Sequence, residues 1–345
     1  MSARYRLEPL TGNQIAQWDD LIASYDTRQL FHRGEWLDYL AASRRVDIRH
    51  WAIRDGDSTV GYFCGGLLRK GPFKILGSPL KGWGTNYMGP VVDSTFDSQA
   101  FLRALDELAA AERIAMIEIE SPIVAEKSLA AFSYEPTEQQ TYVIDLTPGH
   151  PETVWSRIDL KSRQKIKKAQ RLNLAVEETT SPALAREFYE QFVEVLARKS
   201  LSPPYGPDCP RLLLQYLQPH DMIFGLRVRD SQGSVIATGI FPHDERTVYF
   251  WGGASRIAAW AFSPNDLLQW RVIELACQRG LQRYNMCGYG YFKSKFGGLL
   301  EHPPRWHKFY SPAARWARRG YEAYFENRIR LRGWWHRRAL ESPKA

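Results

Sequence analysis

The chain has 345 residues, with 46 Lys and Arg against 38 Asp and Glu, so its formal net charge is +8. This length exceeds what one hydrophobic core usually supports and favours two domains. Apolar residues make up 44% and charged residues 24%, which is typical of a globular protein and excludes a disordered chain. The charge is uneven, because residues 161–171 and 305–345 are strongly basic and the rest is mildly acidic.

The sequence lacks the patterns that are characteristic of several classes of protein. No apolar run reaches the ~18 residues that span a bilayer, and the N-terminal segment has no signal-peptide core, so we expect a cytoplasmic protein. Walker, GxSxG and strand-linked GxGxxG motifs are absent. No metal is expected, because the histidines form no HExxH pattern and the cysteines have no metal-ligand spacing: Cys64, Cys209, Cys277 and Cys287.

The first half reads as mixed helices and strands. Ile15, Trp18 and Ile22 share the spacing of one helix face. A Gly/Pro-rich stretch occupies residues 71–90. The other predicted elements are strands at 49–55 and 60–68 around the turn at 56–58, a helix at 98–113 and a strand at 115–120.

The second half repeats this order. Its predicted elements are helices at 182–199 and after 208, strands at 223–229, 235–241 and 247–252, a helix at 264–279 and a strand at 283–287. The hairpin IRDGDSTVGYF in the first half is echoed by VRDSQGSVIATGIF in the second. We therefore expect two copies of one α/β unit, at residues 1–145 and 146–311, followed by a basic aromatic helix and tail at 312–345.

The helix predicted at 264–279 has strong local signals. Ser263 can cap it, Pro264 suits its first position, and Asp266 stands where a capping-box acid belongs. Gly280 provides the stop. No glycine-rich turn precedes this helix to hold a pyrophosphate, and Asp266 would compete with an anion, so acyl-CoA binding in the second half is disfavoured.

The second half also carries a set of family motifs: GGAS at 252–255, PNDLLQW at 264–270 and FKSKFGG at 292–298. They resemble the FemABX family, whose members add amino acids to peptidoglycan precursors. The run SRQKIKKA at 162–169 is similar to the basic helix that opens the family's second domain. The resemblance implies a mixed α/β fold of two tandem GCN5-related N-acetyltransferase (GNAT) domains, with a C-terminal helix that folds back on the first.

The function that the resemblance implies is transfer of an acyl or aminoacyl group to an amine on a cell-envelope precursor or a sugar-type acceptor. The donor is expected to be aminoacyl-tRNA or acyl-CoA, with no tightly bound cofactor, an acceptor that carries phosphate, and a monomeric protein. One alternative is an acyl-CoA-dependent N-acyltransferase in polysaccharide or lipid modification. Another is a non-catalytic scaffold, which stays open because Asn285 stands where the family often has Asp.

Lys293, in the spacing Lys-x-x-Phe-Gly, is the expected catalytic residue. Its ammonium would stabilise an oxyanion or hold a donor phosphate, so Lys293→Ala should abolish transfer and leave the fold intact. The alternative is a solvated lysine on a turn. If residues 161–171 are helical, Arg163, Lys167 and Arg171 share one face, which would bind phosphates or simply be solvated. Asp266 is a possible general base, although capping explains it equally well.

Three tyrosines complete the expected substrate-binding set. Tyr289 and Tyr291 flank Gly290 in a glycine-rich loop, and Tyr205 lies in a proline-rich loop; each would line the substrate groove or pack in the interior. In the basic tail, residues 312–330 are expected to dock on the protein. Residues 331–340 would form an anchor on the anionic surface of the inner membrane.

Overall fold

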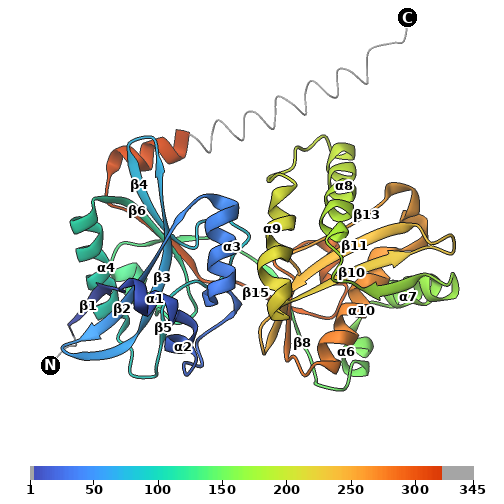
Figure 1. Ribbon diagram of the computed structural model, residues 1–345, viewed down its shortest axis with the longest axis horizontal. Helices are drawn as coiled ribbons and strands as arrows, with labels where there is room; N and C mark the ends of the chain where they lie inside the picture. The colour runs from blue at the N-terminus through green and yellow to red at the C-terminus, as the bar shows by residue number, and fades with distance from the viewer. Residues whose placement is uncertain (1–3, 321–345) are drawn as a thin grey trace, which may run out of the picture.

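The computed structural model describes residues 4–320, which form two α/β units side by side (Figure 1). The mixed α/β architecture predicted from the repeated order of elements is confirmed. None of the helices within residues 4–320 combines the length and apolarity needed to cross a membrane.

The first unit is built on one eight-stranded sheet in the order β1-β2-β3-β4-β6-β16-β7, with β5 paired to β3. All its pairs are antiparallel except β4 with β6. Side chains alternate across β2, so Trp51 and Ile53 contact the cluster beneath α4 and Ala52 contacts the cluster around α3. The strands are β1 (Tyr5–Pro9), β2 (Asp47–Asp55), β3 (Ser58–Lys70), β4 (Phe73–Ser78), β5 (Val91–Val92), β6 (Ile114–Glu120), β7 (Glu135–Thr137) and β16 (Arg305–Phe309).

In the first unit the helix predicted at 98–113 is confirmed as α4. The single helical face expected from Ile15 to Ile22 belongs to two short helices, because the backbone leaves helical geometry at Gln17 (φ −105°, ψ 17°). The helices are α1 (Gly12–Ala16), α2 (Trp18–Ile22), the 3₁₀ turn η1 (Leu30–His32), α3 (Gly34–Arg44), α4 (Ser98–Glu112) and α5 (Glu126–Ala131).

The second unit has two four-stranded sheets, and the chain passes from one to the other between β12 and β13. β12 and β13 are separated only by Phe250 and Trp251, yet β12 pairs in parallel with β14 while β13 pairs with β11. The strand predicted at 247–252 is therefore interrupted there. One sheet has the order β13 (Gly252–Ser255), β11 (Val235–Pro242), β10 (Ile223–Arg229), β9 (Ala175–Glu178), and the other β12 (Thr247–Tyr249), β14 (Arg283–Asn285), β8 (Thr141–Asp145), β15 (Leu299–Glu301).

Helix α10 is the central helix of this unit and is buried on most sides. Its predicted C-terminal end at Gly280 is confirmed, because this glycine is left-handed (φ 79°), as is common just after a helix. The predicted cap is wrong: Ser263 is left-handed (φ 57°) because it ends the 3₁₀ helix η3, and its side chain makes no capping hydrogen bond. The helices are α6 (Glu152–Arg157), α7 (Leu160–Arg171), α8 (Ala183–Arg198), α9 (Asp208–Leu217), η2 (Gln218–His220), η3 (Ile257–Phe262), α10 (Pro264–Gln278) and α11 (Tyr291–Ser294).

Two strands lie across the division at residue 145 that the sequence suggests. β8 precedes this division but pairs with β14 and β15 of the second unit. β16 follows the second unit in the chain but pairs with β6 and β7 of the first. The chain therefore crosses between the units twice, and each unit completes its sheet with a strand from beyond the division.

The return strand β16 is held by a buried charge cluster. Arg305, 3% exposed, pairs with Glu118 (2.9 Å) and with Glu120, which are 2% and 0% exposed. Its Nε also donates to Gln139 Oε1 at 2.7 Å, and one Nη donates to the carbonyl of Pro79 at 3.0 Å. These bonds join β16 to three separate segments of the first unit, at residues 79, 118–120 and 139.

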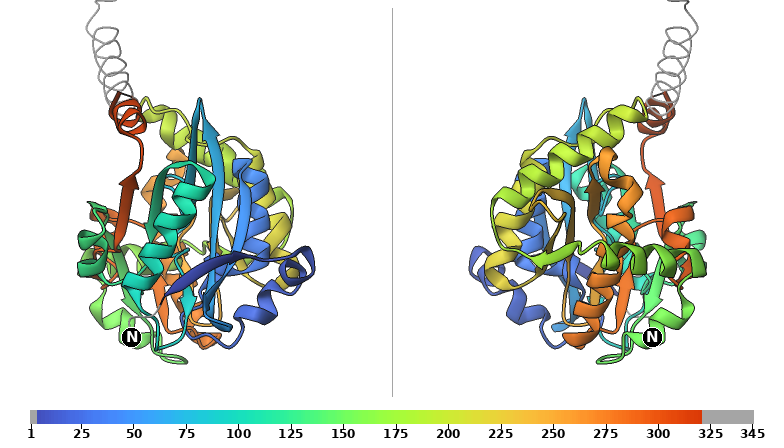
Figure 2. Two further views of the ribbon diagram at one scale, coloured as in Figure 1. Left: turned by 90° about the vertical axis from the view of Figure 1, so that its left-hand side faces the viewer. Right: turned by 90° about the vertical axis from the view of Figure 1, so that its right-hand side faces the viewer.

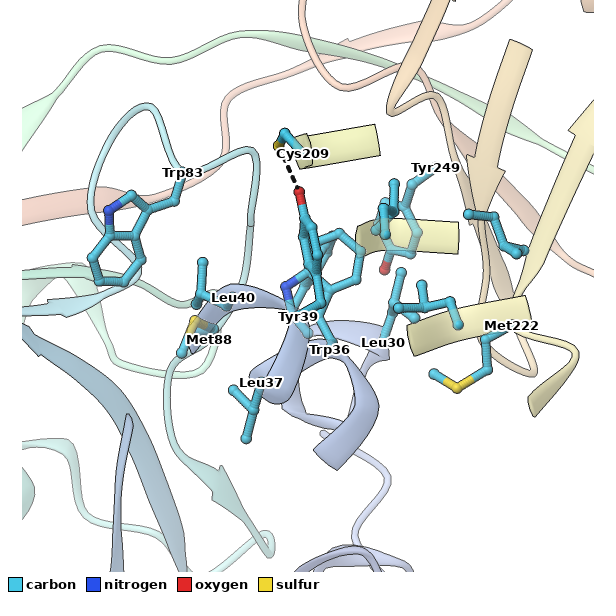
Figure 3. Close-up of a cluster of buried hydrophobic side chains, with 14 of the residues drawn as sticks. Leu30, Trp36, Leu37, Tyr39, Leu40, Trp83, Met88, Cys209, Met222 and Tyr249 are labelled. Atoms are coloured by element: carbon cyan, nitrogen blue, oxygen red, sulfur yellow. Dashed lines mark hydrogen bonds between the residues drawn. The ribbon is translucent and has the colours of Figure 1, made fainter. Parts of the chain in front are cut away.

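The two units share one hydrophobic core. Helix α3 of the first unit packs against α9 of the second, and Figure 3 shows their side chains in a single cluster. Within it the hydroxyl of Tyr39 lies 3.2 Å from the sulfur of Cys209. Nearby, the backbone N–H of Leu30 donates to the Asp244 carboxylate at 2.8 Å. Because the contact is apolar and continuous, we expect the relative position of the units to be fixed.

The C-terminal helix begins at residue 312 and packs on the first unit, as predicted. Ala314 is buried, Arg315 pairs with Glu135 at 2.5 Å, and Arg318 pairs with Glu118 at 3.2 Å. The remainder of the predicted docked segment and the predicted surface anchor at 331–340 lie outside the described residues.

Candidate functional site

Three neighbouring hollows that share lining residues lie where the two units meet. The first, of about 500 Å³, is lined mainly by segments 23–29, 244–249 and 301–304, and the second, of about 450 Å³, by segments 138–141 and 287–289. The third, of about 320 Å³, we call the aromatic hollow; its wall includes Phe31, Trp36, Tyr205, Tyr249 and Trp251. Tyr87 and Asn285 line both the first and the second hollow, and Asn86 and Cys287 line both the second and the aromatic hollow.

Asn285, the last residue of β14, is held at this junction by a fixed set of hydrogen bonds. Its Oδ1 accepts from Thr141 Oγ1 (2.7 Å) and from the backbone N–H of Cys287 (2.8 Å). Thr141 Oγ1 in turn accepts from the backbone N–H of Gly288 at 2.9 Å. With Oδ1 engaged twice, the amide is oriented so that Nδ2 donates one of its two hydrogens to the hydroxyl oxygen of Tyr87, at 3.4 Å.

Tyr87 comes from the first unit and faces Asn285 across the cleft. Its backbone is left-handed (φ 48°), as is that of Cys287 (φ 50°), and such strained positions gather at functional sites. Burial raises the pKa of Tyr87 well above its ordinary value, so the hydroxyl keeps its proton. The Tyr87 O–H and the Asn285 Nδ2–H are thus two hydrogen-bond donors at the point where the hollows meet.

Cys287 lines the same junction, but its thiol is expected to be unreactive. Burial raises its pKa to about 12, although the nearby Lys293 ammonium opposes the shift. At pH 7.5 iodoacetamide should therefore modify Cys287 at least about 100-fold more slowly than a free cysteine peptide, because only the thiolate reacts. Peptide mass spectrometry measures this rate. Modification as fast as that of the peptide would contradict the prediction and allow a thioester intermediate at this residue.

Lys293 lies behind the junction and supports its loop. Its Nζ donates to the carbonyls of Met286 (2.6 Å) and Cys287 (3.1 Å), and it lies 5.3 Å from the centre of the Phe250 ring. Burial lowers its pKa. The ammonium therefore contacts the backbone of the loop that carries Cys287 and Gly288, and Lys293 is not among the described residues that line the three hollows.

The structure separates the three predicted tyrosines. Tyr289 lines the second hollow and Tyr205 lines the aromatic hollow. Tyr291 is 77% exposed, and the Lys295 ammonium lies over one face of its ring, 4.3 Å from the ring centre. Two of the three therefore reach the cleft.

Residues 160–294 match the family model of the Acetyltransferase (GNAT) domain. This match identifies a GNAT domain at residues 160–294, and it supports an enzyme of the acyltransferase class. The GNAT relationship predicted for the second half is therefore confirmed. No curated protein matches the chain.

Solved structures show how widely the GNAT fold extends over the chain. FemX is 14% identical with a TM-score of 0.70, covering 88% of this chain and 97% of that chain. A tandem GNAT protein from the clavulanic acid biosynthesis pathway is 10% identical with a TM-score of 0.53, covering 90% and 99%. The C-terminal domain of a protein described as a lysylphosphatidylglycerol synthetase from Agrobacterium fabrum is 14% identical with a TM-score of 0.53, covering 88% and 93%. At these identities the likeness shows the fold.

The basic helix at the start of the matched GNAT domain forms as predicted, but away from the cleft. In α7, Lys167 and Arg171 are exposed and Arg163 is half-buried. Figure 2 shows α7 on the side of the second unit that faces away from the first. Arg163, Lys167 and Arg171 are therefore not among the described residues that line the three hollows with Tyr205 and Tyr289.

Helix α7 also covers the start of α10, where a GNAT domain could hold a pyrophosphate. Lys168 Nζ donates to the carbonyl of Ala261 at 3.0 Å, and α7 packs along α10. Asp266 is 6% exposed there. Burial raises the pKa of its carboxyl, and Lys165 and Lys295 partly offset this. A cofactor at this helix start would have to displace α7, and Asp266 does not line the hollows.

The sequence did not single out Tyr87 or Asn86. Both lie between β4 and β5, in the part of the Gly/Pro-rich stretch at residues 79–90 that carries no periodic pattern. Asn285 was noticed only as a departure from the family's usual Asp. Within residues 4–320 no three or more His, Cys, Asp or Glu side chains are grouped to hold a metal ion.

Proposed function

We propose that this GNAT acyltransferase transfers an acyl or aminoacyl group to the amine of a cell-envelope precursor or a sugar-type acceptor, and that the reaction takes place at the junction of the three hollows. The observation that carries the proposal is the contact between Asn285 and Tyr87, in which Nδ2 donates one hydrogen to the Tyr87 hydroxyl oxygen at 3.4 Å. The second Nδ2 hydrogen and the Tyr87 O–H are the two donors that would bind the carbonyl oxygen of the substrate. One unit supplies each donor, so the site exists only where the units meet.

The proposed chemistry is direct attack by a neutral amine on an activated acyl carbonyl. The new C–N bond forms as the carbonyl oxygen becomes an oxyanion, and the C–O or C–S bond to the donor then breaks. The amine loses its proton to the departing group or to solvent. Two donors fixed in advance at the oxyanion position would stabilise this state more than they stabilise the substrate.

The neighbouring hollows support a reaction between two substrates. An acceptor in one of the first two hollows and a donor in the other would meet at Tyr87 and Asn285, which line both hollows. Holding both reactants in this geometry removes much of the entropic barrier. The proposed contribution of Lys293 is to position the loop of residues 286–288 through its two carbonyl contacts.

The structural neighbours indicate which acceptor and donor to propose. One structural neighbour is FemX and another is described as a lysylphosphatidylglycerol synthetase. Their names favour an aminoacyl donor and an envelope acceptor for this chain too. The acyl-CoA-dependent alternative is weaker in the second unit, because α7 covers the start of α10. The scaffold alternative is not retained, because the GNAT domain match supports an enzyme.

A transfer assay tests this function. The full chain is incubated with an amine-bearing envelope precursor or an amino sugar nucleotide, and with either charged tRNA or acyl-CoA. Mass spectrometry should show an acceptor heavier by one acyl or aminoacyl group, and Lys293→Ala should abolish this product. Transfer to water alone, or no transfer from either donor class, would contradict the proposal, whereas unchanged product from Lys293→Ala would remove that residue's role. Lys127→Gln, an exposed change on α5, is the matched control that should leave transfer unchanged.

A further inference from the structure

A second cluster of cations lies at the edge of the first unit. It surrounds a hollow of about 440 Å³ at the end of the β3–β4 hairpin, which is at the top of the first unit in Figure 1. We call it the basic hollow. Its charged lining residues are Arg44, Arg45, Arg49, Arg69, Lys70 and Lys74, with Asp47 as the one acid among them.

Most of this positive charge is not neutralised. Arg49 pairs with Asp47 at 2.7 Å and Lys74 pairs with Glu112 at 2.5 Å. Arg45, Arg69 and Lys70 make no salt bridge to any residue in the 4–320 range that the structure describes. Like charges held around a concave surface repel one another and concentrate counter-ions, so the hollow favours an anion with more than one charge.

Arg44 connects the basic hollow to the aromatic hollow, because it lines both. One Nη donates to the carbonyl of Trp83 at 2.9 Å, while its buried Nε has no acceptor among the described residues. A Cβ placed on Gly84 would lie 3.6 Å from Trp251 Nε1 and 3.9 Å from Arg44 Nη2. Two N–H-bearing groups therefore converge over a residue that has no side chain.

The aromatic hollow is built to receive a flat group. Tyr205 stacks on Phe192 (5.3 Å between ring centres, 11° between planes) and tilts against Trp251 (5.4 Å). The hydroxyl of Tyr189 donates to the carbonyl of Tyr205 at 3.1 Å and fixes this loop. Prearranged aromatic rings bind nucleobases by stacking without strong sequence preference. This hollow leads to Cys287 at the proposed reaction site.

We propose that the two hollows form one binding site for a phosphorylated nucleotide, with the phosphates in the basic hollow and the base against Tyr205 and Trp251. Arg44 and Trp251 contact the group between them. This inference deepens the proposed function, on which it rests, since it makes one substrate of the transfer nucleotide-linked. Three sources share this chemistry: the nucleotide of coenzyme A, the 3′ end of an RNA, and a sugar nucleotide.

Calorimetry on the full chain tests the site with three probes: coenzyme A, a short RNA hairpin ending in CCA, and a uridine diphosphate sugar. The double variant Arg69→Gln/Lys70→Gln should bind the recognised probe about ten-fold more weakly, because two phosphate contacts are lost. If the probe is RNA, the slope of log affinity against log salt should also fall by about 1.4. Trp251→Phe keeps the ring, removes the N–H and should weaken the same probe several-fold.

The matched control is Arg6→Gln/Lys127→Gln, which removes two exposed cations elsewhere on the first unit and should bind as the unaltered chain does. The probe that binds identifies the source. Binding of none of the three, or equal weakening by both double variants, would overturn the site. Because binding is measured without turnover, a protein that binds but does not transfer would contradict the proposed function and leave this site standing.

Discussion

Replacing Arg305 by Met should lower the free energy of unfolding by about 3–5 kcal/mol, the usual cost of leaving buried charges without their partner. Arg305 is 3% exposed and neutralises Glu118 and Glu120, which are 2% and 0% exposed. Met fills a similar volume, so the loss reports charge and hydrogen bonds more than packing. Chemical denaturation measures the effect, provided that unfolding is two-state in this two-unit chain.

The loss should be smaller at low pH. Burial already raises the pKa of Glu120 in the folded protein, and Arg305 opposes that shift. Without Arg305 the pKa of Glu120 in the folded protein rises further above its unfolded value. The loss of unfolding free energy is therefore complete at a pH above this folded-state pKa, and it becomes smaller as the pH falls below it and Glu120 is protonated. The control is Arg283→Met, whose pair with Glu301 is 47% and 40% exposed and is worth about 0–1 kcal/mol. Similar losses in both variants would contradict the account of β16.

Replacing Tyr87 by Phe should lower kcat by about 100- to 1000-fold, the usual effect of removing one oxyanion donor. The ring and its left-handed backbone stay, and only the hydroxyl that faces Asn285 is removed. If the hydroxyl acts in the transition state, KM should change little. Steady-state kinetics of the transfer reaction measures both constants.

Tyr25→Phe is the matched control, because Tyr25 also lines the first hollow but does not line the second. It should leave kcat within about two-fold, since no described contact places its hydroxyl at the junction. A large rise in KM without a change in kcat for Tyr87→Phe would mean that the hydroxyl binds substrate only. Equal losses in both variants would indicate a general disturbance of the cleft.

Local patterns in the sequence predicted many of the helices and strands and the class of fold. Apolar periodicity located α4, α8 and α10, and the turn residues at 56–58 and 230–233 located the two hairpins. The motifs at 252–298 indicated the GNAT relationship that the domain match confirms. These signals succeed because they depend on residues a few positions apart, where local geometry and burial act together.

Which candidate residues come together depends on the folding of the whole chain. The run at 161–171 is helical as expected, yet α7 places Arg163, Lys167 and Arg171 on the outer side of the second unit. Conversely, Tyr87 and Asn285 are 198 residues apart in sequence and face each other across the cleft. Strand β16 likewise pairs with β6, although the two strands are far apart in the sequence. Such contacts depend on long-range packing between the units, and no local pattern in the chain records it.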